Sequence, residues 1–296
     1  MTQKISHLRA VAYAVLGYTV WVLTDCCSKL AGQAHVPLVQ ILGFSSLFSA
    51  GTIFLVCALR GQRRELAPKH FRIEAMRFAV YLMSSFANVM AFTHLPLTTV
   101  YVGIFLSPML VSLGAALFMG ELISWKHGLA IVAGFLGVLL AVNPAGIDLH
   151  GGAAAGYIAL PFFLLLNVAF VLMTRLSSRG ASSVSLAFIP QFARSIVLLP
   201  ICLWLYEPMQ WTGWLTIVAL GLTSATGWLL VSAAIKHAPM AMVTPFNYSQ
   251  IITGALMGYL IWSDIPDWHL MVGAAVIIAS GLYIANQARK PLVVPA

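Results

Sequence analysis

The sequence has very few charged residues for its length. Only 8% of its 296 residues are Asp, Glu, Lys or Arg, whereas about a quarter of a typical soluble chain is charged. Hydrophobic residues make up 60% of the chain, and the mean hydropathy is +0.93. A surface of this composition is solvated by lipid. The composition therefore excludes an ordinary soluble globular protein and predicts an all-α integral membrane protein.

Cysteine is scarce, and the motifs of nucleotide and metal chemistry are absent. The four cysteines (Cys26, Cys27, Cys57 and Cys202) lie in or beside apolar runs, and their spacing matches neither a zinc site nor a disulfide framework. The sequence contains no G-x-x-x-x-G-K-[ST] motif, which excludes ATP hydrolysis by this chain, and no catalytic triad is identifiable. We therefore expect no catalytic residue, no metal, no cofactor and no enzymatic activity.

Ten apolar runs have the length that a helix needs to cross a membrane, about 20 residues. They lie at about 8–30, 36–59, 74–93, 98–119, 125–143, 153–174, 183–206, 211–235, 240–262 and 268–287. None has the short apolar core and small-residue cleavage site of a removed signal peptide, so we expect the first helix to remain.

The few charged residues are distributed unevenly between the two ends of these runs. With the N-terminus inside, the inner ends and loops hold Lys4, Arg9, Arg60, Arg63, Arg64, Lys69, Arg72, Arg77, Lys126, Arg175, Arg179, Lys236, Arg289 and Lys290. The outer loops hold Asp148, Glu207, Asp264 and Asp267, and Lys29 is the one basic residue there. Because basic loops stay in the cytoplasm, we expect a multi-pass protein of the cytoplasmic (inner) membrane with both termini cytoplasmic. The net charge of +8 then reflects topology and contact with the lipid bilayer, and no nucleic acid is expected as a partner.

The chain contains an internal repeat with an offset of 143 residues. His94 recurs as His237 without a gap (237 − 94 = 143). The same offset matches Ala91, Pro96, Val100, Glu121, Trp125 and Asn143 with Ala234, Pro239, Val243, Asp264, Trp268 and Asn286. This predicts two five-span domains, 1–146 and 153–290. Five is odd, so the second half enters the membrane from the opposite side. We expect ten transmembrane helices as two inverted five-helix repeats, a common construction of secondary transporters.

Arg194 is the charged residue deepest in a predicted span. It lies about eleven residues, or about 16 Å, from either end of its span, too far to reach water easily, so it should face a cavity or a partner. A guanidinium there could bind a carboxylate or phosphate with two hydrogen bonds. The alternative is a structural arginine bonded to carbonyl groups and to neighbours such as Gln191.

Two further pairs of residues are candidates for gating. Asp25 and Lys29 are four residues apart at the outer end of the first span, which permits an ion pair and suggests an inert pair or an outer gate more than a central proton site. Pro108 and Pro245 each lie inside a span, where a proline removes a helical hydrogen bond and favours a kink that could act as a hinge.

Aromatic and amide side chains near the middle of several spans suit a small organic ligand. Asn247 and Gln250 are the strongest candidates, because two amides within one turn are hard to leave unsatisfied in lipid. The remaining candidates are Tyr18, Trp21, Tyr81, Ser84, Asn88, Tyr101, Ser107, Asn167, Trp228 and Tyr248. Gly254 and Gly258 form a small-xxx-small pattern, which serves either packing within the chain or a dimer face, so a monomer and a homodimer are both open.

These residues resemble the drug/metabolite transporter superfamily, in its EamA-type branch of ten-helix transporters. The resemblance rests on Pro108, Gly120, Glu121, Trp125, Gly128, Gly134, Gly137 and Val138 in the first half and on Pro245, Asp264, Trp268, Gly273 and Gly281 in the second. It implies a secondary carrier of small metabolites. The arginine common in the second helix of each family half is matched by Arg194 alone, since 43–46 reads Gly-Phe-Ser-Ser. Small four-helix relatives that export cationic drugs use a glutamate in the middle of their first helix, and 16–21 has no acid.

The combined expectation is a secondary transporter that uses alternating access. Its small-molecule substrate would be a carboxylate-bearing or zwitterionic metabolite such as an amino acid, which the protein would export or exchange. One alternative is uptake or exchange of S-adenosylmethionine, a nucleotide-like compound or a di- or tricarboxylate. An alternative of another class is a non-transporting membrane scaffold or lipid-handling protein.

Overall fold

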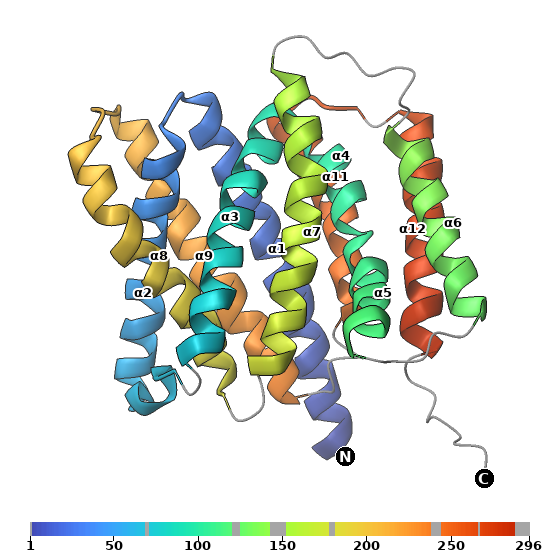
Figure 1. The fold of residues 1–296 in the computed structure, drawn as a ribbon, viewed down its shortest axis with the longest axis horizontal. Helices are drawn as coiled ribbons and strands as arrows, with labels where there is room; N and C mark the ends of the chain where they lie inside the picture. Colours follow the sequence, from blue (N-terminus) through green and yellow to red (C-terminus); the bar gives the residue numbers. More distant parts are fainter. Residues whose placement is uncertain are drawn as a thin grey trace.

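The computed structural model describes residues 2–68, 71–119, 125–142, 152–177, 181–237, 244–265 and 267–287. The regular secondary structure in these ranges is entirely helical (Figure 1). The first half contains α1 (Thr2–Gln33), α2 (Leu38–Leu59), η1 (Arg63–Leu66), α3 (Phe71–His94), α4 (Leu97–Ile104), α5 (Ser107–Met119) and α6 (Trp125–Val142). The second contains α7 (Ala153–Ser177), α8 (Ser183–Trp204), α9 (Trp211–His237), η3 (Thr244–Tyr248), α11 (Ser249–Trp262) and α12 (Trp268–Gln287). Outside the described ranges lie Lys69, Gly120, Glu121, Asn143, Asp148, Arg179, Pro239, Val243, Arg289 and Lys290.

Each of the ten expected spans coincides with a helix or with a pair of consecutive helices. Seven are long and apolar enough to cross a membrane by length and composition, namely those in α1, α2, α3, α4 with α5, α7, α8 and α9. Shorter apolar helices lie within α6 and α12. The span expected at 240–262 is described from residue 244 onward, as η3 and α11. The predicted all-α membrane fold is confirmed.

Two of the spans depart from a single continuous α-helix close to their prolines. The span at 98–119 consists of α4 and α5, separated by a two-residue turn. Pro108, in the first turn of α5, has no N–H group, which removes the donor that the carbonyl of Ile104 would have in a continuous helix. The span at 240–262 contains Pro245 in the 3₁₀ helix η3 before α11 begins. The side chains of both prolines lie outside the described part of the structure, and their role as hinges stays a prediction.

The two halves pack in a pattern that is unchanged when they are exchanged. α1 packs along α9, and its counterpart α7 packs along α3, the counterpart of α9. α2 packs against its own counterpart α8, and α6 against its own counterpart α12 (Figure 1). α1 begins at the lower side of Figure 1, whereas α7 begins at the upper side. The halves are therefore inverted repeats related by an approximate two-fold axis, as the sequence predicts.

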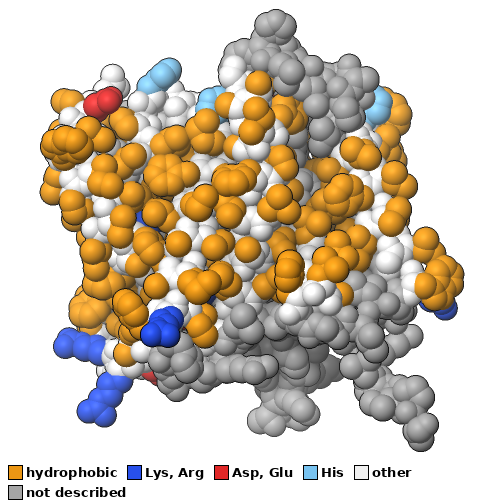
Figure 2. Space-filling view, in the orientation of Figure 1, with side chains coloured by type: hydrophobic (Ala, Val, Ile, Leu, Met, Phe, Trp, Pro, Cys, Tyr) orange, Lys and Arg blue, Asp and Glu red, His pale blue; other side chains and the backbone are white. Residues whose placement is uncertain are grey.

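Large apolar side chains cover the outside of the helices. Phe54, Leu55, Leu165 and Leu256 are examples that are exposed. Figure 2 shows apolar side chains over most of one face, with protruding Lys and Arg side chains along its lower edge. An apolar belt with basic residues at one edge is the surface that a bilayer solvates.

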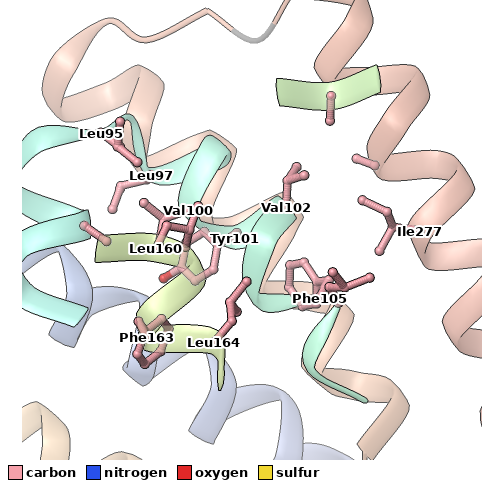
Figure 3. Packing of buried hydrophobic residues seen from close by; sticks show 14 of the residues in the cluster. Leu95, Leu97, Val100, Tyr101, Val102, Phe105, Leu160, Phe163, Leu164 and Ile277 are labelled. Carbon is pink, nitrogen blue, oxygen red and sulfur yellow. The ribbon is translucent and has the colours of Figure 1, made fainter. Parts of the chain in front are cut away.

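The largest buried apolar cluster surrounds α4. Tyr101 and Phe105 from the α4 segment, Leu160 and Leu164 from α7, and Ile277 from α12 belong to this cluster (Figure 3). Because lipid tails are as apolar as these side chains, close packing is what stabilises such a contact in the membrane. The cluster joins a broken span of the first half to two helices of the second half.

Candidate functional site

Arg194 lies in the middle of α8 with its side chain buried between the two halves. Its exposed fraction is 6%. Nη1 donates a hydrogen bond to Oγ of Ser85 on α3 at 2.9 Å, and Nη2 donates to Oε1 of Gln191 at 2.7 Å. The guanidinium also lies over the ring of Tyr81, 5.1 Å from its centroid. The charged side chain of Arg194, which belongs to the second half, is thus positioned by residues of α3, which belongs to the first half.

One atom of this guanidinium has no partner among the described residues. Nε of Arg194 is buried and makes no hydrogen bond within this part of the chain, which is costly for a charged donor. The bond to Gln191 is the one that the structural alternative predicts. The unpaired Nε is what an anion-binding arginine would present, because Nε and one Nη form a planar fork that matches a carboxylate.

Three predicted aromatic residues form a cluster beside Gln250. The ring centroids of Tyr18 and Trp21, both on α1, are 5.5 Å apart, and those of Trp21 and Trp228 on α9 are 5.2 Å apart. Nε2 of Gln250 on α11 donates to the carbonyl oxygen of Tyr18 at 3.4 Å. Four candidate residues therefore come together from α1, α9 and α11, which belong to different halves.

α9 connects this aromatic cluster to Arg194. Ser224 on α9 accepts a hydrogen bond from Nε2 of Gln191 at 3.3 Å, and Gln191 in turn bonds Arg194. Trp228 follows Ser224 by one turn of the same helix. Arg194 and the aromatic cluster thus border the same region between the halves.

Asp25 bonds a tyrosine and not the lysine that its spacing predicted. Oδ2 of Asp25 accepts a hydrogen bond from the hydroxyl of Tyr101 on α4 at 2.6 Å. Lys29 instead forms an ion pair with Asp264, with Nζ and Oδ2 3.4 Å apart. The predicted pair of Asp25 with Lys29 is therefore wrong. The spacing permits that pair, but Lys29 forms its ion pair with a carboxylate of the other half.

The C-terminal end of α1 meets the end of α11 and the segment that follows it through four residues: Lys29, Gln33, Trp262 and Asp264. We call them the outer contact, after the side on which the charge distribution of the sequence predicts them to lie. Besides its ion pair with Asp264, Nζ of Lys29 lies 4.4 Å from the centroid of the Trp262 ring. Nε1 of Trp262 donates to Oε1 of Gln33 at 2.7 Å. The outer contact joins the two halves, and its role as a gate stays a prediction.

The remaining predicted amides have varied surroundings. Asn167 on α7 donates to Oγ of Ser107 on α5 at 3.4 Å, so it joins the two halves at a different place. Asn88 on α3 is half-buried. Asn247 in η3 is also half-buried and follows Phe246, which packs against the cluster that contains Tyr18.

A buried ion pair that the sequence pattern does not predict lies near the beginning of α3. Glu74 and Arg77 are 4% and 0% exposed, and Nη2 of Arg77 lies 2.7 Å from Oε2 of Glu74. Arg77 also donates to Oγ1 of Thr174 at 3.4 Å and to the carbonyl oxygen of Leu186 at 3.1 Å, while Ser177 donates to Glu74. We call these five residues the inner contact, after the side on which the sequence predicts them to lie. It joins α3 of the first half to α7 and α8 of the second.

Two aromatic rings connect the inner contact to Arg194. The guanidinium of Arg77 lies 5.4 Å from the centroid of the Phe170 ring, which is 5.2 Å from the ring of Tyr81. Tyr81 lies under Arg194 in turn. The adjacent rings of Phe170 and Tyr81 therefore lie between two guanidinium groups, one near the beginning of α3 and one in the middle of α8.

Comparison with known proteins explains a fold of two similar halves. The sequence matches the EamA-like transporter family twice, over residues 8–143 and 157–286. The chain belongs to the EamA-like transporter family. Membership makes it a multi-pass membrane protein, and supports transport over an enzymatic or scaffolding activity.

This EamA-like transporter is similar to relatives named for different small molecules. It is 22% identical to the S-adenosylmethionine uptake transporter of Rickettsia felis, over 97% of this chain and 96% of the relative. It is 26% identical to the riboflavin transporter of Brucella anthropi, over 92% of this chain and 97% of the relative. It is also 26% identical to the pseudopaline exporter CntI of Pseudomonas aeruginosa, over 93% of this chain and 95% of the relative. These names support a small-molecule transporter and include both uptake and export.

A solved crystal structure shares the fold of this EamA-like transporter. The two chains are 15% identical and superpose with a TM-score of 0.64, over 97% of this chain and 99% of the other. The likeness shows the fold alone. The identity of the substrate therefore has to be argued from this chain's own residues.

Proposed function

We propose that this protein is a secondary transporter that moves a small carboxylate-bearing or zwitterionic metabolite, such as an amino acid, across the cytoplasmic membrane. The observation that carries the proposal is Arg194, a buried guanidinium between the halves whose Nε has no hydrogen-bond partner in the described parts of the chain. The substrate carboxylate would bind Nε and one Nη. This would relieve the cost of the unpaired donor.

Other candidate residues would complete the binding site. The rings of Tyr18, Trp21 and Trp228 would pack against the apolar part of the substrate, as aromatic residues do in small-molecule sites. Nε2 of Gln250 donates to the carbonyl oxygen of Tyr18, so the amide oxygen of Gln250 would accept a hydrogen bond from the substrate. Asn247 would supply a further amide.

Alternating access would use the inner and outer contacts. Both join the first half to the second at opposite ends of the helices, so opening the site to one side requires the contact on that side to separate. The break between α4 and α5 near Pro108 and the 3₁₀ segment that contains Pro245 would accommodate the change in backbone angle. The approximate symmetry of the halves supports this mechanism, because exchanging their conformations converts one open state into the other.

A second candidate is a larger zwitterion such as S-adenosylmethionine. The relative from Rickettsia felis, named for uptake of that compound, covers almost the whole chain. Such a substrate carries a carboxylate, so Arg194 would keep its role while the aromatic cluster would bind the larger remainder.

Counterflow into proteoliposomes that contain the purified protein tests the proposal. Amino acids, di- and tricarboxylates, S-adenosylmethionine and quaternary amines are compared as substrates. We expect counterflow of carboxylate-bearing compounds, and the best compound separates the first candidate from the second. Counterflow of quaternary amines alone would show that the proposed substrate class is wrong.

Substitution of Arg194 tests the residue itself. Arg194→Gln should reduce carboxylate counterflow about 10- to 100-fold, because a hydrogen-bonded charge pair contributes roughly 1.5–3 kcal/mol. Arg194→Lys, which keeps the charge but not the planar fork, should be intermediate. The matched control is Arg60→Gln, the same change at an exposed position, which should stay within about twofold of wild type. If Arg194→Gln keeps the carboxylate counterflow of the wild type, Arg194 has a structural role and does not bind the substrate.

A further inference from the structure

Asp25 is an acidic residue of a membrane span that has no basic partner among the described residues. It lies one turn inside Lys29 on α1, and Lys29 is paired with Asp264. The described polar partner of Asp25 is the hydroxyl of Tyr101. An ionisable side chain within a span is costly and marks a functional position unless a partner neutralises it. Here the described structure supplies a hydroxyl but no cation.

Tyr101 donates a short hydrogen bond to the carboxyl group of Asp25. The two oxygens are 2.6 Å apart, within the range of charge-assisted O–H···O⁻ bonds. An ionised carboxylate only accepts hydrogen bonds and has room for several, so one hydroxyl leaves most of its capacity free. What it lacks is a donor with a positive charge.

Tyr101 is held firmly in place by its neighbours. Its side chain is 1% exposed, and its ring packs against Phe92 and Phe105 with centroids 5.6 and 6.2 Å apart. Gly254 of α11 lets the ring lie directly against the second half, because a methyl group at position 254 would be 2.5 Å from ring carbons. Asp25 is therefore presented at a place where both halves meet.

The aromatic cluster lies one helical turn from Asp25. Trp21 precedes Asp25 by four residues on α1, and its ring packs edge-on against Trp228. Aromatic faces attract cations, most strongly where water is excluded. A cation beside Asp25 would meet a carboxylate and aromatic faces together. Arg194 is linked to α9, which carries Trp228 of the same cluster, through Gln191 and Ser224.

We propose that Asp25 binds the ammonium group of the transported molecule, so that the site recognises a zwitterion at both ends. Arg194 of the second half takes the carboxylate, and Asp25 of the first half takes the protonated amine. Tyr101 is a positioning residue that holds the Asp25 carboxylate. A molecule bound in this way bridges the two halves. This inference rests on the proposed function for the carboxylate end and adds a specificity for the other end.

The test uses three probes that differ only in charged groups: phenylalanine, 3-phenylpropanoate without the amine, and 2-phenylethylamine without the carboxylate. Each is measured as a competitor of counterflow of the amino acid most active in the substrate screen. In wild type the zwitterion should compete at least 10-fold better than either single-charge probe. Asp25→Asn should remove this preference over 3-phenylpropanoate while changing the affinity for 3-phenylpropanoate itself less than twofold. Arg194→Gln should do the converse and remove the preference over 2-phenylethylamine.

Three further variants guard against a folding artefact. Asp25→Glu keeps the charge and should retain part of the preference for the zwitterion. Tyr101→Phe should weaken competition by phenylalanine and 2-phenylethylamine about three- to tenfold but leave 3-phenylpropanoate unchanged. Asp267→Asn removes an exposed carboxylate at the start of α12, where asparagine caps equally well, and should alter none of the three affinities.

The outcomes separate this inference from the proposed function. If only di- or tricarboxylates are transported, or if Asp25→Asn weakens all three probes equally, the ammonium site is wrong while the role of Arg194 stands. If 2-phenylethylamine competes best and Arg194→Gln has no effect, the proposed carboxylate specificity fails while Asp25 can still bind a cation.

Discussion

Two glycines on α11, one turn apart, have different surroundings. A methyl group at Gly254 would be 2.5 Å from the ring of Tyr101, whereas one at Gly258 would first meet Asp264 at 3.7 Å, an ordinary contact. Gly254 thus serves packing within the chain, one of the two roles that the small-xxx-small pattern left open.

We predict that Gly254→Ala and Gly258→Ala have opposite effects on stability. Overpacking against Tyr101 should destabilise Gly254→Ala by about 1–3 kcal/mol. Gly258→Ala should be neutral or stabilise by up to about 1 kcal/mol, because alanine has the higher helix propensity. Unfolding of the purified proteins by SDS in mixed micelles measures both. Equal stability of the two variants would show that the Tyr101 ring has room to move.

At the level of single residues, the sequence identified charges inside spans but not their partners. Arg194 could be identified because its distance from either end of the span can be counted in the sequence. The partner of Lys29 was not visible, since Asp264 follows 235 residues later and competes with Asp25 one turn away. Helical spacing states which side chains can meet, and tertiary packing decides between the possibilities.

Among the elements, α3 carries the most consequential feature that the sequence did not reveal. Glu74 and Arg77 lie at the edge of a span, next to a basic loop, where charges ordinarily face lipid headgroups and water. Their burial follows from Thr174 and Ser177 of α7 and from the Leu186 carbonyl of α8, about a hundred residues further along the chain. The i, i+3 spacing of an acid and a base was the one available signal.

The inner contact predicts a non-additive pair of substitutions. Arg77→Gln should destabilise the protein by about 3–5 kcal/mol, because it leaves the buried carboxylate of Glu74 without a cation. The double variant Glu74→Gln, Arg77→Gln should lose much less than the sum of its single variants, since no buried charge remains. The exposed Arg72→Gln on the same helix should change stability by less than about 0.5 kcal/mol. Additive free energies of unfolding in SDS would contradict this account of the pair.

For the whole molecule, the repeat and the charge distribution made the fold predictable. A gap-free offset of 143 residues, an odd number of spans and basic residues at one edge together specify two inverted halves. The helix pairing was not predictable in the same way. In the structure α1 packs along α9, and α7 packs along α3. This pairing depends on how the side chains fit together, and the apolar pattern of the sequence is equally compatible with other pairings.

The proposed orientation predicts where reporters are active. Alkaline phosphatase, which needs an oxidising compartment, should be active when fused after residue 146, and a fluorescent protein should fold in the cytoplasm when fused after residue 296. The half 153–290 expressed alone should insert with its first residue outside, because Arg175, Arg179 and Lys236 remain on the inner side of its helices. Insertion of that half in the opposite sense would show that its orientation is imposed by the first half.

The exchange-symmetric packing of the helices also has a consequence for biosynthesis. α1 leaves the ribosome long before the helix along which it packs, since α9 begins only at Trp211. α3 likewise emerges well before α7. The first half must therefore remain in the bilayer while the surfaces of α1 and α3 that contact the second half are still unoccupied. Neither half completes its tertiary structure alone. Two halves made as separate chains in one cell should find each other and restore transport, because assembly is the last step of folding even in the intact chain.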